Sequence, residues 1–244
     1  MFGWRARIGV LVPPGNPTVE PELYMMAPPG VTVHCARLQG FQSASTPGAA
    51  AGMETRTLAY LDDLADPAKA LGSVHPSVVI LAHTASSYAT GFADEPQLIA
   101  RIASLTGTTA ITAARAVLAA LQHLGVKKLA LGTPYPEAIS AKGRAFWEAA
   151  GFDIVGYQRL ADVHNIYAEN EQRAYQLARQ ANTPAADAVF LSGTGLPTVG
   201  VLETLEQDLK KPVISSNQAS LWQALRLAGV RQAIPGFGRL LREI

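Results

Sequence analysis

Residues 78–91 read VVILAHTASSYATG, and this stretch decides the fold. Its first five residues are apolar and mostly β-branched, a run too short for a buried helix and typical of a strand covered on both faces. A polar stretch, residues 83–88, follows directly. Because ligands bind at the carboxyl ends of strands in open α/β sheets, we expect a binding site in this polar stretch.

The same pattern recurs about half a chain later, where apolar residues 188–191 lead into a polar stretch that begins at Ser192. Two more segments correspond: RIGVLVPPGNP at 7–17 and KKLALGTPYPE at 127–137 each combine an apolar strand with a proline-containing turn. Strands that alternate with helical segments indicate parallel sheets with helices on both faces. The repeat therefore predicts an α/β protein of two pseudo-symmetric halves with the site in the cleft between them.

The repeat also predicts the domain limits. We expect residues 1–112 to form the first half and residues 113–216 the second, with 217–244 returning to the first half. Apolar spacing predicts helices over the ranges 54–70, 112–125, 167–181 and 199–209. Residues 40–52 are poor in charge and rich in Ser, Ala and Gly, which predicts a loop and a candidate lid.

Composition limits the partners. The 244 residues carry a formal net charge of +1 and no run of basic residues, which disfavours a nucleic acid as a partner. No stretch approaches the roughly 20 apolar residues of a membrane span. Pro13 and Pro14 interrupt the N-terminal apolar run, which predicts a first strand rather than a signal peptide. We therefore expect a cytoplasmic protein with no membrane partner; the sequence leaves the oligomeric state open, a homo-oligomer included.

The sequence predicts neither a metal site nor a nucleotide site. Its single cysteine, Cys35, excludes an intrachain disulfide and a cysteine-based metal cluster. No pair of histidines has the spacing of a metal-binding helix, and no phosphate-binding glycine motif follows the first strand. The short Gly193-Thr194-Gly195 segment lacks a third glycine and is typical of a tight turn.

Several segments together resemble a known superfamily. The C-terminal part contains PVISS at 212–216, WQALRLAG at 222–229 and PGFGRL at 235–240, and the chain begins with RIGVLVP at 7–13 and NPTVE at 16–20. These segments resemble the aspartate/glutamate racemase superfamily, with the arylmalonate decarboxylases and the maleate cis-trans isomerases as its nearest members. The resemblance covers nearly the whole chain. It implies two Rossmann-like halves, a small carboxylate substrate and no cofactor.

This chain departs from the superfamily at its cysteines. The chemistry there usually rests on two cysteines, one from each central loop, and the decarboxylases resemble that plan with only the second cysteine kept. The two positions correspond to His83 and Gly193 here, and Cys35 lies on a different predicted strand. The resemblance therefore supports the fold and the ligand class better than it supports one reaction.

The resemblance also implies substrate-binding residues. Thr84 resembles the carboxylate-binding threonine of the family and Tyr135 its carboxylate-binding tyrosine, which we also count among the catalytic candidates. Asn16 and Asn165 resemble the paired asparagines of the isomerases, whose amides hold a carboxylate without a net charge. The other predicted substrate-binding residues come from the strand-end loops, whose N–H groups, hydroxyls and walls suit an anionic ligand. They are Pro14, Ala85, Ser192, Gly193 and Thr194.

His83 is the leading catalytic candidate. It stands at the predicted ligand-facing end of a central strand, where the family places its acid or base. Histidine titrates near neutrality, so we expect this side chain to deliver or take a proton.

We expect a cofactor-independent enzyme that acts alpha to a carboxylate through an enolate-like intermediate. Decarboxylation of a substituted malonate is the leading reaction, because it needs one oxygen cradle, one dry pocket and a single proton donor. The first alternative is cis-trans isomerisation of an unsaturated diacid, favoured by Asn16 and Asn165. Two more remain open: a hydrolytic or ring-opening enzyme that uses His83, and a non-catalytic protein that binds small carboxylates.

Overall fold

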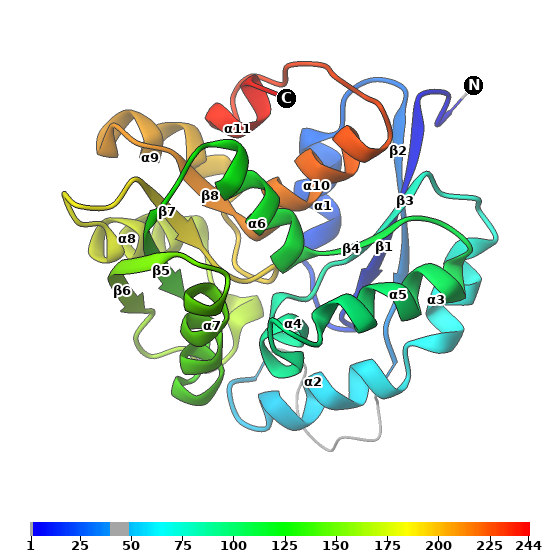
Figure 1. Cartoon of the computed structure of the whole chain (residues 1–244), viewed down its shortest axis with the longest axis horizontal. Helices are drawn as coiled ribbons and strands as arrows, with labels where there is room; N and C mark the ends of the chain where they lie inside the picture. Colours follow the sequence, from blue (N-terminus) through cyan, green and yellow to red (C-terminus); the bar gives the residue numbers. More distant parts are fainter. Residues whose placement is uncertain (1, 40–48) are drawn as a thin grey trace.

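The computed structural model describes residues 2–39 and 49–244, and these residues form two four-stranded parallel sheets (Figure 1). The strand orders are β2-β1-β3-β4 and β6-β5-β7-β8, so each strand has a counterpart at the same place in the other sheet. This confirms the predicted α/β fold of two similar halves. The strands are β1 (Ala6–Val12), β2 (Val31–Arg37), β3 (Val78–Leu81), β4 (Ala110–Thr112), β5 (Lys128–Thr133), β6 (Asp153–Arg159), β7 (Ala188–Leu191) and β8 (Val213–Ser215).

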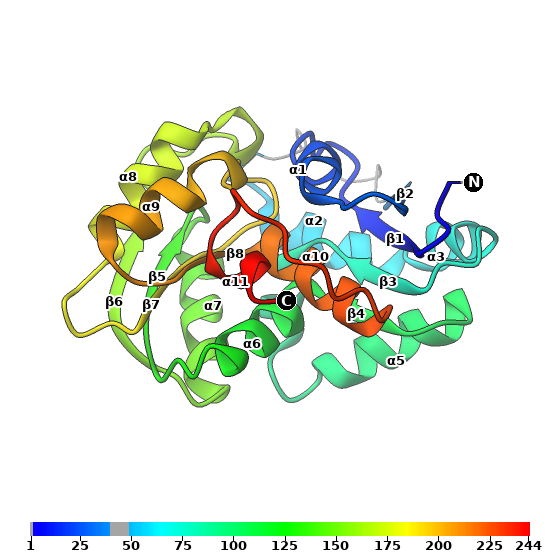
Figure 2. The same ribbon diagram turned by 90° about the horizontal axis from the view of Figure 1, so that it is seen from above.

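Helices cover both sheets, as Figure 2 shows for α8 and α9 on one side of the second sheet and α6 and α7 on the other. The α-helices are α1 (Val19–Met26), α2 (Met53–Asp62), α3 (Ala65–Gly72), α4 (Thr84–Thr90), α5 (Glu95–Thr106), α6 (Ala113–His123), α7 (Glu137–Ala149), α8 (Glu171–Ala181), α9 (Leu202–Leu209), α10 (Ser216–Leu227) and α11 (Arg239–Arg242). Two 3₁₀ turns, Ile166–Ala168 and Val199–Val201, precede α8 and α9. No helix in the described part of the chain is both long and apolar enough to cross a membrane.

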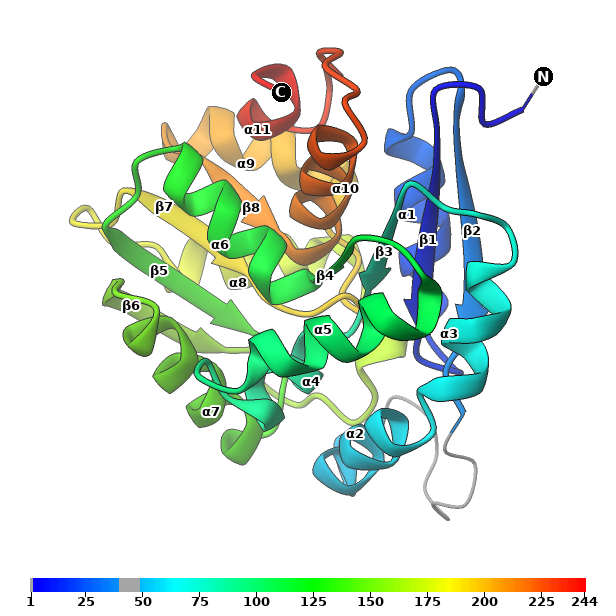
Figure 3. The ribbon, with the colours of Figure 1, turned by 45° about the vertical axis from the view of Figure 1, so that its right-hand side comes forward.

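The core explains why the central strands are continuous apolar runs. Every residue of β3 and of β7 is buried, as expected for strands covered on both faces. One apolar cluster joins one face of the first sheet to the second half, and a smaller cluster fills the other face of the first sheet under α3 and α5. Helix α10 packs against both β3 and β8 and lies between the halves (Figure 3).

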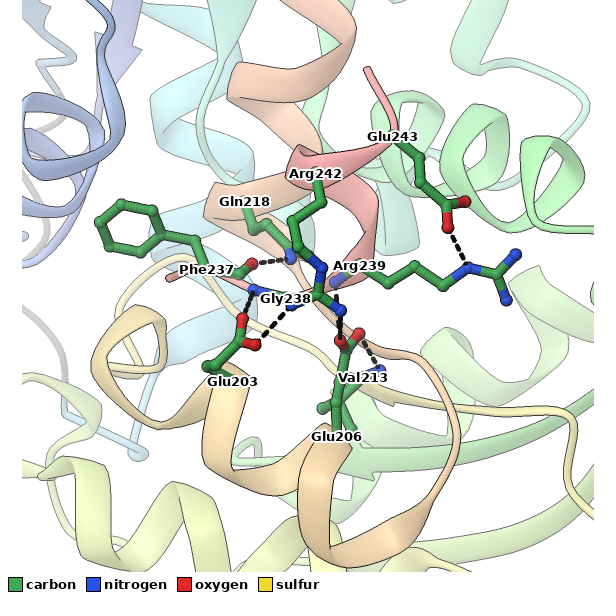
Figure 4. A network of polar contacts seen from close by, with 9 residues as sticks. All are labelled: Glu203, Glu206, Val213, Gln218, Phe237, Gly238, Arg239, Arg242 and Glu243. Atoms are coloured by element: carbon green, nitrogen blue, oxygen red, sulfur yellow. Dashed lines mark hydrogen bonds and ion pairs between the residues drawn. The ribbon is translucent and has the colours of Figure 1, made fainter. Parts of the chain in front are cut away.

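The end of the chain is bonded to the second half (Figure 4). Glu203 on α9 accepts from the Gly238 N–H (2.9 Å) and pairs with Arg242 (2.5 Å). Glu206 accepts from the Arg239 N–H (2.6 Å), and burial raises the pKa of this carboxyl. The segment after α10 therefore contacts α9, while α10 itself contacts both sheets. The division into a first half of residues 1–112 with 217–244 and a second half of residues 113–216 stays a prediction.

Two local predictions were wrong. The helix predicted over 54–70 is broken into α2 and α3, because Pro67 has no N–H for a helical bond and is tolerated in the first turn of a new helix. The sequence predicts a loop at residues 83–88, but Thr84–Thr90 is helix α4. Its Ser and Thr residues have low helix propensity, and packing in the core overrides that preference.

Two other helices start later than predicted. Helix α8 begins at Glu171 rather than 167, where Asn170 caps it by accepting from the Arg173 N–H (3.0 Å). Helix α9 begins at Leu202 rather than 199. The candidate lid at 40–52 falls mainly on residues 40–48, which lie outside the described residues.

Candidate active site

A small cavity lies where the carboxyl ends of the strands of the two sheets face each other. Three of its residues come from the first half and five from the second, so the cavity lies between the halves as predicted. It has room for about one water molecule in this structure. The residues that line it are Asn16, Met53, His83, Tyr135, Ile166, Tyr167, Thr194 and Gly195.

Asn16 follows β1 and is fixed by the start of helix α1. Its Oδ1 accepts from the N–H groups of Thr18 (2.8 Å) and Val19 (3.1 Å), two of the donors that a helix start leaves unpaired. Its Nδ2 therefore points the other way, toward the Thr194 hydroxyl at 3.5 Å across the cleft. The buried amide presents N–H donors to the cavity and carries no net charge.

His83 follows β3, stands at the N-cap position of α4 without a capping side-chain bond, and is buried. Its Nδ1 lies 2.8 Å from the Ser86 hydroxyl, and the Tyr60 ring meets it edge-on with centroids 5.5 Å apart. Burial and, to a smaller extent, the nearby positive charge of Arg56 together lower the pKa of His83 to about 4. The imidazole is thus neutral at pH 7, and the expectation that it titrates near neutrality was wrong for the free protein.

Thr84 and Gly193, which are predicted to bind substrate from the two halves, both bond to Ser216. The Thr84 hydroxyl donates to Ser216 Oγ (3.0 Å), and the Gly193 N–H donates to the same oxygen (3.0 Å). Ser216 is the first residue of α10 and fully buried. Sequence reasoning missed it, although it stands at the carboxyl end of β8, where the same rule that singled out residues 83 and 192 applies.

Tyr135 is a buried hydrogen-bond donor. Its hydroxyl lies near the side chains of Thr84 and Ser192, and burial raises the pKa of the phenol well above its ordinary value. The group therefore stays protonated and can donate to a carboxylate oxygen.

Gly193 packs closely under Tyr135 and Pro134. A Cβ at position 193 would lie 3.1 Å from the Tyr135 hydroxyl and 3.0 Å from Pro134 Cγ. The φ of Gly193 is +105°, which L side chains rarely adopt. Any side chain here, a thiol included, would strain the loop unless its neighbours moved.

Thr194 and Ser192 have different surroundings. The Thr194 hydroxyl lines the cavity and donates to the Ala82 carbonyl (2.8 Å), which ties the second loop to the end of β3. The Ser192 hydroxyl is bonded to the Tyr88 hydroxyl (2.8 Å), which also accepts from the Trp147 indole (2.9 Å). Thr194 therefore faces the ligand space, while Ser192 supports the loop from behind.

Six predicted binding residues are not part of the cavity lining: Thr84, Ser192 and Gly193, described above, and Pro14, Ala85 and Asn165. The Pro14 carbonyl accepts from Arg37 (3.1 Å), and Ala85 packs into the core. The Asn165 Oδ1 caps the following turn by accepting from the Tyr167 N–H (2.9 Å). Their roles toward a substrate stay a prediction.

Four lining residues were missed. Met53, Ile166 and Tyr167 form an apolar wall, and Gly195 closes the second loop. Met53 begins helix α2, and Ile166 and Tyr167 lie in a 3₁₀ turn. No sequence pattern indicates that such positions meet at a site.

The chain offers no reactive thiol at the cavity. Cys35 lies on β2, away from the cavity lining, and burial with the nearby Glu20 raises its pKa to about 12. Within the described residues, no group of three or more His, Cys, Asp or Glu side chains is arranged to hold a metal ion.

Comparison with known proteins matches this architecture. The model of the arylmalonate decarboxylase family matches residues 8–241. The arylmalonate decarboxylase of Bordetella bronchiseptica is 32% identical over 195 residues, 76% of this chain and 79% of that protein. A crystal structure of arylmalonate decarboxylase superposes with a TM-score of 0.79 at 28% identity and covers 98% of this chain and 100% of its own.

The maleate isomerase of Nocardia farcinica is 29% identical over 249 residues, 97% of this chain and 96% of that protein. A structure of its cysteine-to-serine variant, described with a covalently bound succinylcysteine intermediate, has a TM-score of 0.87 at 24% identity and covers 98% of this chain and 99% of its own. Because the family model spans nearly the whole chain and the decarboxylase exceeds 30% identity over three quarters of it, this chain belongs to the arylmalonate decarboxylase family of enzymes.

Proposed function

We propose that this protein acts on small carboxylic acids at the carbon alpha to a carboxylate, through an enolate-like intermediate, and that its reaction is decarboxylation of a substituted malonate. One observation carries the proposal: the polar groups that line the cavity are uncharged hydrogen-bond donors from both halves. They are the Asn16 amide from the first half and the Tyr135 phenol from the second, with the neutral His83 beside them. The Thr194 hydroxyl also lines the cavity, but its proton is donated to the Ala82 carbonyl.

The donors and the apolar wall suggest how a malonate would lie. One carboxylate is held by Asn16 Nδ2 and the Tyr135 hydroxyl, and the other faces the apolar side chains of Met53 and Ile166. The bond from the alpha carbon to this second carboxylate breaks and carbon dioxide leaves. The electron pair remains on the alpha carbon and spreads onto the held carboxylate as an enediolate, whose developing charge the donors stabilise.

The reaction is completed by a proton on the alpha carbon. His83 is neutral in the free protein, but a negative charge beside it favours the imidazolium form. An enediolate formed next to His83 therefore raises its pKa, so that the imidazole takes a proton from water and passes it to carbon. This assigns His83 the role of proton donor, which the family resemblance implies for a thiol.

The isomerase alternative differs in its nucleophile. The Nocardia farcinica isomerase carries a succinylcysteine intermediate. By the family resemblance, the corresponding positions here are His83 and Gly193, and Cys35 lies elsewhere with a raised pKa. Isomerisation of an unsaturated diacid by this chain would have to proceed without a thiol adduct.

A second candidate function rests on the protonation of His83. A buried imidazole that is neutral at pH 7 is a base, and it could remove a proton from water during hydrolysis or ring opening of a cyclic substrate. A protein that only binds small carboxylates is the remaining alternative.

A turnover screen in deuterated water, read by mass spectrometry, tests the proposal. The panel contains malonates, maleate, amino acids and cyclic imides. We expect a product that is lighter by carbon dioxide and carries one deuterium, and we expect the double variant His83→Ala/Thr84→Ala to lose it. Full turnover in that variant, or fumarate as the only product, would contradict the proposal, and a ring-opened imide would favour hydrolysis. Tight binding without turnover across the panel would favour the binding protein.

A further inference from the structure

One face of helix α1 holds the loop that carries Gly193 and Thr194. Thr18, just before α1, donates its hydroxyl to the Gly195 carbonyl (3.1 Å). One turn later, Glu22 accepts from the N–H groups of Thr198 (2.5 Å) and Val199 (2.9 Å). Residues four apart lie on the same helix face, so the first half bonds to this second-half loop at its middle, Gly195, and at its end, Thr198 and Val199.

Glu22 is a buried carboxylate that N–H groups stabilise. Its residue is 5% exposed, and in the described part of the chain it forms no ion pair with Lys, Arg or His. Burial raises the pKa of Glu22, and the donors at Thr198, Val199 and Asn217 oppose that rise. Burying such a group is costly, and the four donor contacts it receives offset that cost only while they stay in place.

Asn217 connects this carboxylate to the cavity loop. Its Nδ2 donates both to Glu22 Oε2 (2.6 Å) and to the Thr194 carbonyl (3.0 Å). The preceding Ser216 accepts the Gly193 N–H, and the Thr194 hydroxyl donates to Ala82, the neighbour of His83. A continuous set of hydrogen bonds thus runs from Glu22 through Asn217 and Thr194 to the end of β3.

We propose that Glu22 is a positioning residue for catalysis, which acts through Asn217 to hold Gly193 and Thr194 in place, so that the Thr194 side chain keeps its position in the cavity lining. Glu22 does not line the cavity, so its effect on a substrate is indirect. Donors that stabilise a developing oxyanion lose much of their effect when they are displaced by a fraction of an ångström to 1 Å. This inference rests on the proposed function of the cavity.

The test compares Glu22→Gln with Glu95→Gln. Glutamine has the shape of glutamate, but its amide N–H₂ would face the Asn217 N–H₂, and two donors cannot bond to each other. Glu95 is a matched control: it is fully buried, accepts from Thr112 (2.5 Å) and Arg115 (2.5 Å), and lies outside the cavity lining. Both variants remove one buried carboxylate.

In the turnover assay, we expect Glu22→Gln to lower kcat by roughly tenfold to a hundredfold with a smaller change in KM. We expect Glu95→Gln to lower the thermal midpoint at least as much while kcat stays within about twofold of the parent protein. If the loss of kcat followed the loss of thermal stability in the same way in both variants, Glu22 would have a structural role only.

A second measurement does not depend on turnover. Amide hydrogen exchange at Gly193 and Thr194 reports how firmly the loop is held. We expect faster exchange there in Glu22→Gln and unchanged exchange there in Glu95→Gln. If Glu22→Gln does not fold, Asn217→Ser breaks the same connection from the other side and should give the same result. Unchanged exchange at these amides would overturn the inference, whereas a screen without any product would overturn the proposed function alone.

Discussion

At the scale of single residues, the protonation of His83 links the site to its chemistry. Its pKa of about 4 in the free protein follows mainly from burial, with Arg56 adding to the effect. The other titratable side chains around it are phenols, Tyr60 from α2 and Tyr135 and Tyr167 across the cavity, all held protonated by burial. A bound dianion is then the strongest negative charge the imidazole meets, and it moves the pKa of His83 upward.

At about pH 6, we therefore expect malonate binding to be accompanied by uptake of a proton from solution, because His83 is neutral in the free protein and becomes charged in the complex. Titration calorimetry in two buffers of different protonation enthalpy measures this uptake. The variant His83→Gln should bind malonate without it. Equal heats in both buffers for the parent protein would show that His83 does not change its protonation on binding.

At the scale of elements, helix α6 shows how a local pattern becomes a tertiary contact. Thr112 was predicted as its start, and its Oγ1 accepts from the Arg115 N–H (3.1 Å). The same hydroxyl donates to the buried carboxylate of Glu95 (2.5 Å).

We expect Thr112→Ala to lose about 1–3 kcal/mol of unfolding free energy, because it removes a cap and leaves a buried acceptor with one donor fewer. Chemical denaturation measures the loss. The variant Thr112→Ser keeps the hydroxyl and should keep most of the unfolding free energy of the parent protein. Equal losses in both variants would show that packing of the methyl group matters instead.

The elements that the sequence predicted best are those whose pattern is local and strong. The β3 and β7 runs, the Thr112 cap and the proline-containing turns after β1 and β5 all act within a few residues. Helix α4 was missed because its Ser and Thr residues favour a helix only after burial. The break between α2 and α3 depends on Pro67, whose position in a first turn can be read from the sequence but was not used.

At the scale of the whole molecule, the duplication predicted the architecture, and the contacts between halves escaped prediction. The polar positions at 83 and 192 could be singled out because each directly follows its own strand. Ser216, Asn217 and Glu22 contribute through partners that are distant in the sequence, such as Gly193 and Thr198, and no spacing rule reports such pairs. Tyr167 reaches the cavity because a turn, rather than the predicted helix, places it there.

The last prediction concerns how the chain end is held to the second half. Arg242 pairs with Glu203 (2.5 Å) and contacts the largely buried Glu206 (3.4 Å), so its removal leaves two carboxylates close together without their shared cation. We expect Arg242→Ala to lose about 1–2 kcal/mol of unfolding free energy and to speed amide exchange in residues 235–242.

Arg239→Ala is the control, since its exposed side chain pairs only with Glu243 in the described structure while its backbone N–H keeps its bond to Glu206. An exposed pair of that kind contributes about 0–1 kcal/mol. If both variants lost the same stability, the contact with Glu206 would add nothing to an ordinary surface ion pair, and the attachment would depend on the backbone bonds at Gly238 and Arg239.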